Sequence, residues 1–335
     1  MVAEEHRALL VGAGAVGARA ARQLVSLGPL GELFVGDLDT DLAATVAATI
    51  GEPVRAGAVE DFVPGPGDVA VLASAGEHRP LAERALERGA HVVSVSDRPG
   101  DVAALLDLDA EARERRCHVV VGAGFSPGLS CVLVARAATT FEWVDEVHVA
   151  RIGTGGPACA HHHHDSLAGV VPEWWDGQWV RRRAGSGRQL CWFPDPVGGV
   201  DCYRAVTPDR LLLVDAVPGV RRVSIRVAAN RRDRVTAHLP MLRRPHPEGA
   251  VGAVRVEVRG RRGAVRDEQV LGAVDRPALA AAAVCALAAR WALDGRLRRT
   301  GAGGLAELVE PIPFLAALAE RGVKAASFQG AAAAS

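Results

Sequence analysis

The first 125 residues alternate between short apolar runs and segments with helical periodicity. Six apolar runs predict β-strands, at residues 8–11, 33–35, near 54, 69–73, 92–95 and 119–121. Between them, apolar side chains recur every three or four residues, as at Val16, Ala20 and Leu24, which predicts helices. The last of these segments, Asp101 to Arg115, predicts one continuous helix. Apolar strands that alternate with helices are typical of a parallel, doubly wound sheet, so we expect residues 1–125 to form a Rossmann domain.

The pattern changes to strict alternation in the second half of the chain. Val223, Ile225 and Val227 are separated by polar residues, and a similar alternation runs over residues 254–259. A period of two predicts strands with one solvent-exposed face, and hence a largely antiparallel sheet. We therefore expect residues 126–276 to form a second, α+β domain that holds the substrate. Helical periodicity returns over residues 277–291 and 314–318, and we expect the tail from Gly330 to be disordered.

Composition narrows the class of protein. At 335 residues the chain is long enough for two domains, and its 39 basic and 39 acidic side chains leave no excess charge that would favour nucleic acid. No apolar run reaches membrane-spanning length and no charged leader precedes the first strand, so we expect a soluble, cytoplasmic protein. Six scattered cysteines without a C-x-x-C pair indicate reduced thiols. Lys324 is the only lysine and Tyr203 the only tyrosine, which excludes the Tyr/Lys pair of short-chain dehydrogenases.

A glycine motif lies between the first predicted strand and the first predicted helix. It reads Gly12-Ala13-Gly14-Ala15-Val16-Gly17, which is a G-x-G-x-x-G. In a dinucleotide-binding turn the first glycine permits the tight turn, the second lets the pyrophosphate approach the backbone, and the third lets the helix pack on the strand. The helix N-terminus offers free N–H groups and a positive dipole end to the phosphates. We therefore predict cofactor contacts at this motif, from Gly12, Gly14, Ala15, Val16 and Gly17. A purely structural glycine turn is the alternative.

An acidic residue follows the second predicted strand. This residue, Asp37, lies twenty positions beyond Gly17. A carboxylate at this position accepts hydrogen bonds from the ribose diol of NAD and repels the 2′-phosphate of NADP. The neighbouring Leu38 offers no cation to hold that phosphate. These two residues predict NAD as the cofactor, with NADP less favoured.

Further cofactor contacts are predicted from the other strand ends. Ligands of doubly wound sheets bind at the carboxyl ends of the strands, so the loops at 12–17, 74–77, 96–97 and 122–128 should converge on one crevice. The candidate contacts in the last three loops are Ser74, Ala75, Gly76, Ser96, Gly124, Phe125 and Ser126. Asp97 is a candidate catalytic residue at the same edge, although it could equally cap the helix that follows.

A run of four histidines, residues 161–164, is followed by Asp165. Adjacent histidines point in different directions on a strand or a helix, so the four cannot comfortably bind one metal ion. Three interpretations stay open: a solvated loop or helix start with one or two functional histidines, an acid/base histidine near the nicotinamide, and a zinc site. We take His163 and His164 as candidate catalytic residues and predict no metal.

A shaped loop between two predicted strands, residues 191–204, ends in Tyr203-Arg204. Arg204 could bind a substrate carboxylate, because a guanidinium group binds a carboxylate through a bidentate fork. Tyr203 or Asp201 would then orient an amino or imino nitrogen. The alternative is a turn that is stabilised by an Asp–Arg pair and by aromatic packing.

Three segments together resemble the saccharopine dehydrogenase-like (saccharopine reductase-type) family. They are G-A-G-A-V-G at residues 12–17, G-A-G-F-S-P-G-L-S at 122–130 and E-P-I-P-F-L-A-A-L-A-E-R-G at 310–322. The resemblance implies a Rossmann domain, an α/β substrate domain, and a C-terminal segment, residues 277–330, that packs back onto the first domain. It matches residues 124–128 to the loop that faces the nicotinamide ring. Ser126 stands where several lysine-pathway members carry an aspartate.

The resemblance implies hydride transfer at a C–N centre of an amino-acid-derived substrate. We therefore expect an NAD(H) oxidoreductase that interconverts an amine and an imine, with the proton coming from a histidine of the run, Asp97 or water. The alternatives are a dehydrogenase of hydroxy or aldehyde substrates, a non-catalytic NAD-binding protein, and a zinc protein. A homodimer is expected from base rates.

Overall fold

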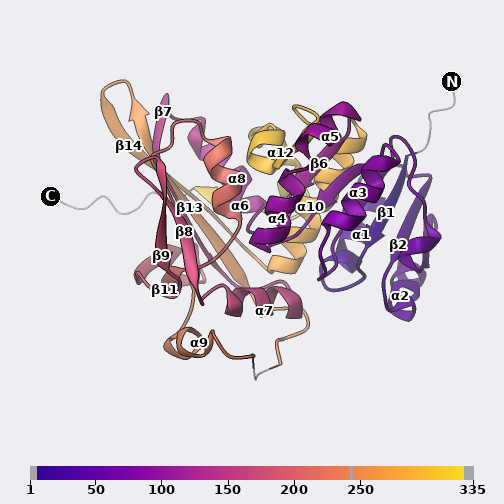
Figure 1. Ribbon diagram of the computed structural model, residues 1–335, viewed down its shortest axis with the longest axis horizontal. Coiled ribbons are helices and arrows are strands. Elements are labelled where there is room, and N and C mark those ends of the chain that lie inside the picture. The colour runs from indigo at the N-terminus through magenta and orange to yellow at the C-terminus, as the bar shows by residue number, and fades with distance from the viewer. Residues whose placement is uncertain (1–5, 242–243, 328–335) are drawn as a thin grey trace.

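Two β-sheets lie side by side in the computed structural model of the chain, with helices between and around them (Figure 1). The structure describes residues 6–241 and 244–327. The predicted disorder of the tail from Gly330 concerns residues outside these ranges.

The first sheet is parallel throughout and has the strand order β15-β6-β5-β4-β1-β2-β3. Its strands are β1 (Arg7–Val11), β2 (Glu32–Gly36), β3 (Val54–Gly57), β4 (Val69–Leu72), β5 (His91–Ser94), β6 (His118–Val121) and β15 (Gly301–Gly304). The direction of winding reverses between β1 and β4, which is where doubly wound sheets bind dinucleotides. The predicted Rossmann architecture is confirmed, and β15 adds a strand that the periodicity did not predict.

Helices cover both faces of this sheet (Figure 1). They are α1 (Gly17–Ser26), α2 (Thr40–Ile50), the short 3₁₀ helix η1 (Val59–Asp61), α3 (Arg79–Glu87), α4 (Pro99–Leu106), α5 (Asp109–Glu114), α10 (Pro277–Leu293), α11 (Leu305–Leu308) and α12 (Pro311–Ala319). Nearly all of the Ala-rich α10 is buried, and it packs on α1, β4 and β5. Small side chains permit this close approach.

The continuous helix predicted over residues 101–115 is wrong, because α4 ends at Leu106 and α5 begins at Asp109. The Asp109 carboxylate accepts a hydrogen bond from the backbone N–H of Ala302 at 2.9 Å and pairs with Arg299 at 3.2 Å. These partners lie about β15, far along the chain, and they hold the start of α5 beside that strand.

The second sheet is mixed and mostly antiparallel, as predicted. Its order is β10-β11-β12-β7-β13-β14-β16, with β8 paired to β12 and β9, and β7–β12 is the parallel pair. The strands are β7 (Trp143–Ile152), β8 (Val170–Trp175), β9 (Gln178–Arg183), β10 (Gln189–Phe193), β11 (Gly198–Arg204), β12 (Arg222–Ala228), β13 (Gly252–Arg262), β14 (Val265–Asp275) and β16 (Ala325–Ser327). Its helices are α6 (Leu129–Ala138), α7 (Pro157–Asp165), α8 (Asp209–Ala216) and α9 (Arg231–Thr236).

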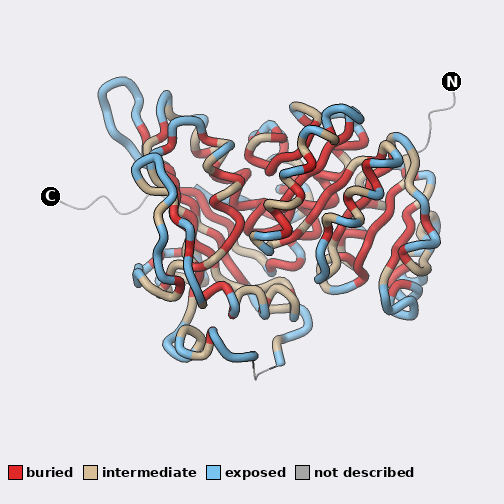
Figure 2. The backbone as a smooth tube through the Cα atoms, viewed as in Figure 1, coloured by how far each residue is buried: buried red, intermediate tan, exposed pale blue. Residues whose placement is uncertain are grey.

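One apolar core runs through both sheets (Figure 2). It joins Leu10 and Val71 of the first sheet to Val149 and Val256 of the second, with Val132 of α6 among the residues between them. Helix α6 contacts β13 and β14 on one side and α11 and α12 on the other. The two sheets are therefore held together by shared packing, which fixes the walls of the space between them.

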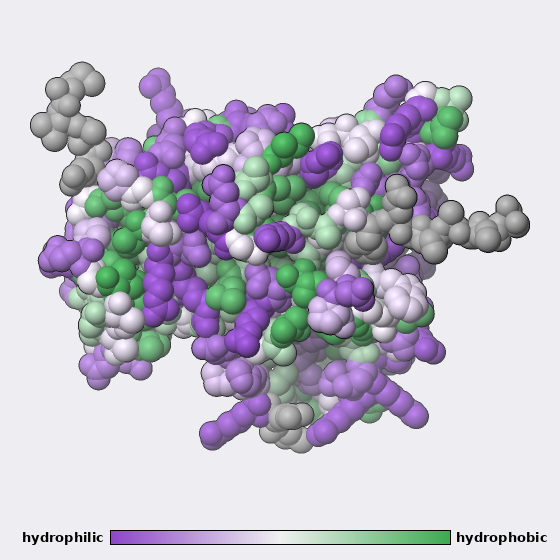
Figure 3. All heavy atoms as spheres, turned by 180° about the vertical axis from the view of Figure 1, so that it is seen from behind, coloured by the Kyte–Doolittle hydropathy of each residue, from purple (hydrophilic) through white to green (hydrophobic). Residues whose placement is uncertain are grey.

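Hydrophilic and hydrophobic side chains are intermixed over the face of the molecule in Figure 3. Several large apolar side chains of the second sheet are exposed, among them Trp143, Trp179 and Trp192. Within residues 6–241 and 244–327, no helix combines the length and the apolar character that crossing a membrane requires.

Candidate active site

A cavity of about 670 Å³ opens at the carboxyl edge of the first sheet. Its walls come from the four loops at that edge, from α2 and η1, from the stretch between the end of β7 and the middle of α7, and from the start of α10. The predicted cofactor residues that line it are Gly12, Gly14, Ala15, Val16, Asp37, Leu38, Ser74, Ala75, Gly76, Ser96, Gly124, Phe125 and Ser126. The structure thus brings the predicted loops together in one crevice between the two sheets.

The three motif glycines have different surroundings. A Cβ atom on Gly12, whose φ is +102°, would lie 2.7 Å from the backbone nitrogen of Ser74. A Cβ atom on Gly17 would overlap the carbonyl oxygen of Gly12. A Cβ atom on Gly14 would meet no protein atom within 4 Å, because this position faces the cavity. Gly12 and Gly17 therefore serve the packing of strand and helix, whereas Gly14 leaves space for a ligand.

The geometry at this turn fits a pyrophosphate group. Helix α1 begins at Gly17 directly after the motif, and no side chain caps its N-terminus. Uncapped N–H groups and the positive end of the helix dipole favour an anion here. The carboxylate of Asp37 lies beside the turn and accepts hydrogen bonds from the backbone N–H groups of Ala13 at 2.6 Å and Asp39 at 2.9 Å.

The Asp37 end of the cavity is apolar and acidic. Leu38 is fully exposed, and Leu42 of α2 and Val59 of η1 line the wall with it. Glu60 of η1 also lines the cavity at this end. Apolar side chains suit an adenine ring, and two carboxylates disfavour a 2′-phosphate.

An Asp–His pair lies at the opposite end. Asp97 follows β5 and His162 belongs to α7, and Nδ1–H of His162 donates a hydrogen bond to the Asp97 carboxylate at 2.5 Å. This hydrogen bond raises the pKa of His162, against the opposing effect of burial. Burial alone would raise the pKa of Asp97, but His162 and the charge of Arg151 together lower it. The pair is therefore poised to hold a proton on His162.

The thiol of Cys159 completes this corner. It lines the cavity one helical turn before His162, and burial raises its pKa to about 11. It is therefore a protonated thiol at neutral pH and a poor nucleophile.

Known structures share this two-domain arrangement. No family model and no curated protein sequence matches the chain. Its structure is similar to saccharopine dehydrogenase (L-Glu forming) from Saccharomyces cerevisiae, with a TM-score of 0.66 at 14% identity over 97% of this chain and 100% of that chain. The fold is similar to that of saccharopine dehydrogenase. An amine dehydrogenase from Mycobacterium smegmatis is also similar, with a TM-score of 0.53 at 12% identity over 92% of this chain and 97% of that chain. These likenesses confirm the fold that the sequence motifs implied.

The loop after β6 carries Ser126, which lines the cavity. The Ser126 hydroxyl donates a hydrogen bond to the carboxylate of Asp209 at 2.6 Å, and Ser130 donates to the same oxygen at 3.0 Å. Asp209 is buried at the start of α8. A carboxylate therefore stands directly behind Ser126 and fixes the loop at the cavity.

Both predicted catalytic histidines, His163 and His164, lie outside the cavity lining. Nε2–H of His163 donates to the carbonyl of Ala228 at 3.0 Å, and burial lowers the pKa of His163 to about 3. His164 donates to the carbonyl of Thr236 at 3.0 Å. Consecutive residues of a helix diverge, so α7 presents only His162 of this set to Asp97. Among the described residues no three His, Cys, Asp or Glu side chains could hold one metal ion.

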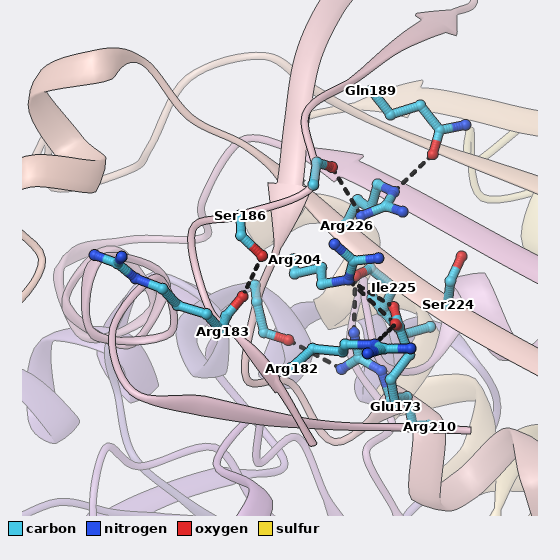
Figure 4. A network of polar contacts seen from close by, with 12 residues as sticks. Glu173, Arg182, Arg183, Ser186, Gln189, Arg204, Arg210, Ser224, Ile225 and Arg226 are labelled. Atoms are coloured by element: carbon cyan, nitrogen blue, oxygen red, sulfur yellow. Dashed lines mark hydrogen bonds and ion pairs between the residues drawn. The ribbon is translucent and has the colours of Figure 1, made fainter. Parts of the chain in front are cut away.

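Tyr203 and Arg204 also lie away from the cavity. Nε of Arg204 donates to both carboxylate oxygens of Glu173, at 3.1 and 3.2 Å, in a network of arginines (Figure 4). Glu173 is only 1% exposed. Tyr203 is buried in a small apolar cluster, with the guanidinium of Arg234 4.1 Å from its ring centre. Arg204 is therefore an internal partner of Glu173, and the predicted carboxylate clamp does not line the cavity.

The sequence predictions missed Arg151. It lies near the end of β7, lines the cavity and is buried. A signal was present in the sequence, because the period of two places Arg151 on the same strand face as Val147 and Val149. A charged residue in an apolar series is a candidate functional residue.

Proposed function

We propose that this protein is an NAD(H)-dependent oxidoreductase that transfers hydride to or from a carbon bearing nitrogen in an amino-acid-derived substrate. The observation that carries the proposal is one cavity that joins the glycine turn to the Asp97–His162 pair. The first feature suits the cofactor and the second suits proton transfer. The cytoplasmic location and the homodimer remain predictions from the sequence.

The cofactor would be held along the carboxyl edge of the first sheet. The N-terminus of α1 and the backbone at Gly14 would receive the pyrophosphate, and Asp37 would bind the adenosine ribose. The nicotinamide half would then lie over β4, β5 and β6, near Gly124–Ser126 and Asp97. When bound, the nicotinamide supplies or accepts the hydride.

The protein would supply the proton that reduction of an imine consumes. Nδ1 of His162 is engaged by Asp97, so Nε2 is the ring nitrogen that can give a proton to the substrate nitrogen. Asp97 acts as a positioning residue, because its carboxylate stabilises the protonated ring and fixes the orientation of the imidazole. In the oxidative direction, neutral His162 accepts the proton that the amine loses.

The proposal is tested by NADH binding followed by an activity panel. The panel pairs NADH with 2-oxo acids plus ammonia or an amino acid, and pairs NAD with amino acids. We expect saturable NADH binding, turnover within this panel, and a fall of about 10²-fold or more in kcat for His162→Gln with unchanged NADH affinity. Turnover only of sugars, alcohols or aldehydes would favour the hydroxy or aldehyde alternative. NADH binding without any turnover would favour a non-catalytic NAD-binding protein.

A further inference from the structure

Arg151 is a buried cation in the wall of the cavity. It is 4% exposed, and its strand, β7, is held in the middle of the second sheet between β12 and β13. Its Nε atom has no hydrogen-bond partner, and none of the described residues forms a hydrogen bond or salt bridge with its guanidinium group. The Asp97 carboxylate is near enough to interact with the charge of Arg151, but the hydrogen bond that this carboxylate accepts comes from His162.

Two half-buried arginines of the second sheet have carboxylate partners. Arg204 pairs with Glu173 at 3.1 Å, and Arg255 pairs with Glu257 at 2.7 Å. A guanidinium group stays charged in proteins, and burying a charge without a partner is costly. A ligand that brings an anion to Arg151 would remove this cost. The folded protein thus holds a buried guanidinium group that interacts electrostatically with Asp97 but forms no hydrogen bond or salt bridge with a described residue.

We propose that Arg151 binds the carboxylate of the substrate, next to the carbon that exchanges hydride. This inference rests on the proposed function and adds a substrate class to it, namely 2-oxo or 2-imino acids and the matching amino acids. The guanidinium fork binds a planar carboxylate through two parallel hydrogen bonds, which fixes the orientation of the neighbouring carbon.

The position of Arg151 supports this assignment. It lines the cavity together with Asp97, His162 and the loop at Ser126, but it comes from the opposite sheet. A substrate held by β7 would therefore lie between the second sheet and the ring of a cofactor bound to the first sheet. Its nitrogen would lie on the side of the Asp97–His162 pair.

Thermal unfolding with a non-reacting probe tests the inference. Oxamate has the carboxylate and planar carbon skeleton of a 2-oxo acid, and ethyl oxamate is its uncharged counterpart. In a low-chloride buffer with saturating NADH, oxamate should raise the Tm of the wild type and ethyl oxamate should not, because a ligand stabilises only the state that binds it. Arg151→Met should keep the response to NADH and raise the Kd for oxamate about 30-fold or more.

Two further variants separate binding from folding. Arg204→Met should keep the oxamate response, although it unfolds at a lower temperature because the buried Glu173 loses its nearer ion-pair partner. Arg151→Met without ligand should be at least as stable as the wild type, because it removes a buried charge that forms no hydrogen bond or salt bridge with a described residue. If Arg151→Met fails to fold, Arg151→Lys decides: it should bind NADH normally and oxamate more weakly.

The inference and the proposed function fail in different ways. A wild type that NADH stabilises and oxamate does not would overturn the carboxylate site and leave the oxidoreductase proposal standing. An undiminished oxamate response in Arg151→Met or Arg151→Lys would also overturn it, since another cation such as Arg98 would then hold the carboxylate. A wild type that NADH does not stabilise would overturn the proposed function itself.

Discussion

The contrast between Gly14 and Gly17 gives a sharp test of the cofactor site. A Cβ atom at residue 14 would meet no protein atom within 4 Å, and the backbone there has no left-handed φ. Gly14→Ala should therefore fold normally, with a change in the free energy of unfolding of no more than about 1 kcal/mol. The new methyl group would instead occupy the space where the pyrophosphate approaches the backbone.

The expected loss is in cofactor affinity. A methyl group forced against a close-packed partner costs about 1–3 kcal/mol. If the bound cofactor bears this cost, the Kd for NADH rises by about 5- to 150-fold, since 1.4 kcal/mol is a factor of ten. Calorimetric titration of the wild type and of Gly14→Ala with NADH measures this change directly.

Gly17→Ala is the matched control. The same methyl group at residue 17 would overlap the carbonyl oxygen of Gly12, so the strand and α1 must move apart. Its cost falls on folding, and the Tm should drop by about 2–4 °C for each kcal/mol. Native NADH affinity in a folded Gly14→Ala protein would refute the reasoning, because it would show that the pyrophosphate does not pass this glycine.

Three further predictions concern other parts of the molecule. Asp37→Ala combined with Leu38→Arg should weaken NADH and strengthen NADPH binding; an unchanged ratio of the two Kd values would show that Asp37 is not the ribose acid. Asp97→Asn should lower the pKa of His162, which NMR can follow. The alkaline limit of imine reduction should fall with it, because reduction needs protonated His162 and is lost as pH rises through that pKa. An unshifted pKa would remove the Asp97–His162 pair from the mechanism. Glu173→Gln should lower the free energy of unfolding by about 3–5 kcal/mol in urea titrations, because guanidinium groups around it lose their partner; near-native stability would show that this network is not needed for folding.

The Rossmann half of the molecule could be predicted because its signals are local. The strand, the glycine turn, the helix and the acid at Asp37 follow one another within one segment, and each residue type is required by backbone geometry or by charge. The convergence of the strand-end loops followed from the rule that parallel strands present their carboxyl ends at one edge. The alternation over β12 and β13 gave the character of the second sheet for the same local reason.

The remaining features depend on residues that are distant in sequence. Of the four histidines in the run, His162 is the one that contacts Asp97, which lies 65 residues away in the sequence. The run itself does not reveal which histidine faces which side of the helix. Arg204 pairs with Glu173 across a strand arrangement that periodicity does not predict. Arg151 was detectable from its place in an apolar strand face, but its lack of a described partner required the structure.

A crystal structure of the protein with bound NADH tests the central claim most directly. The account predicts the pyrophosphate at the N-terminus of α1 in contact with Gly14, the ribose at Asp37, and the nicotinamide ring beside Asp97 and His162. A cofactor bound outside this cavity, or one whose nicotinamide lies at Asp37 and whose adenine lies at His162, would contradict it.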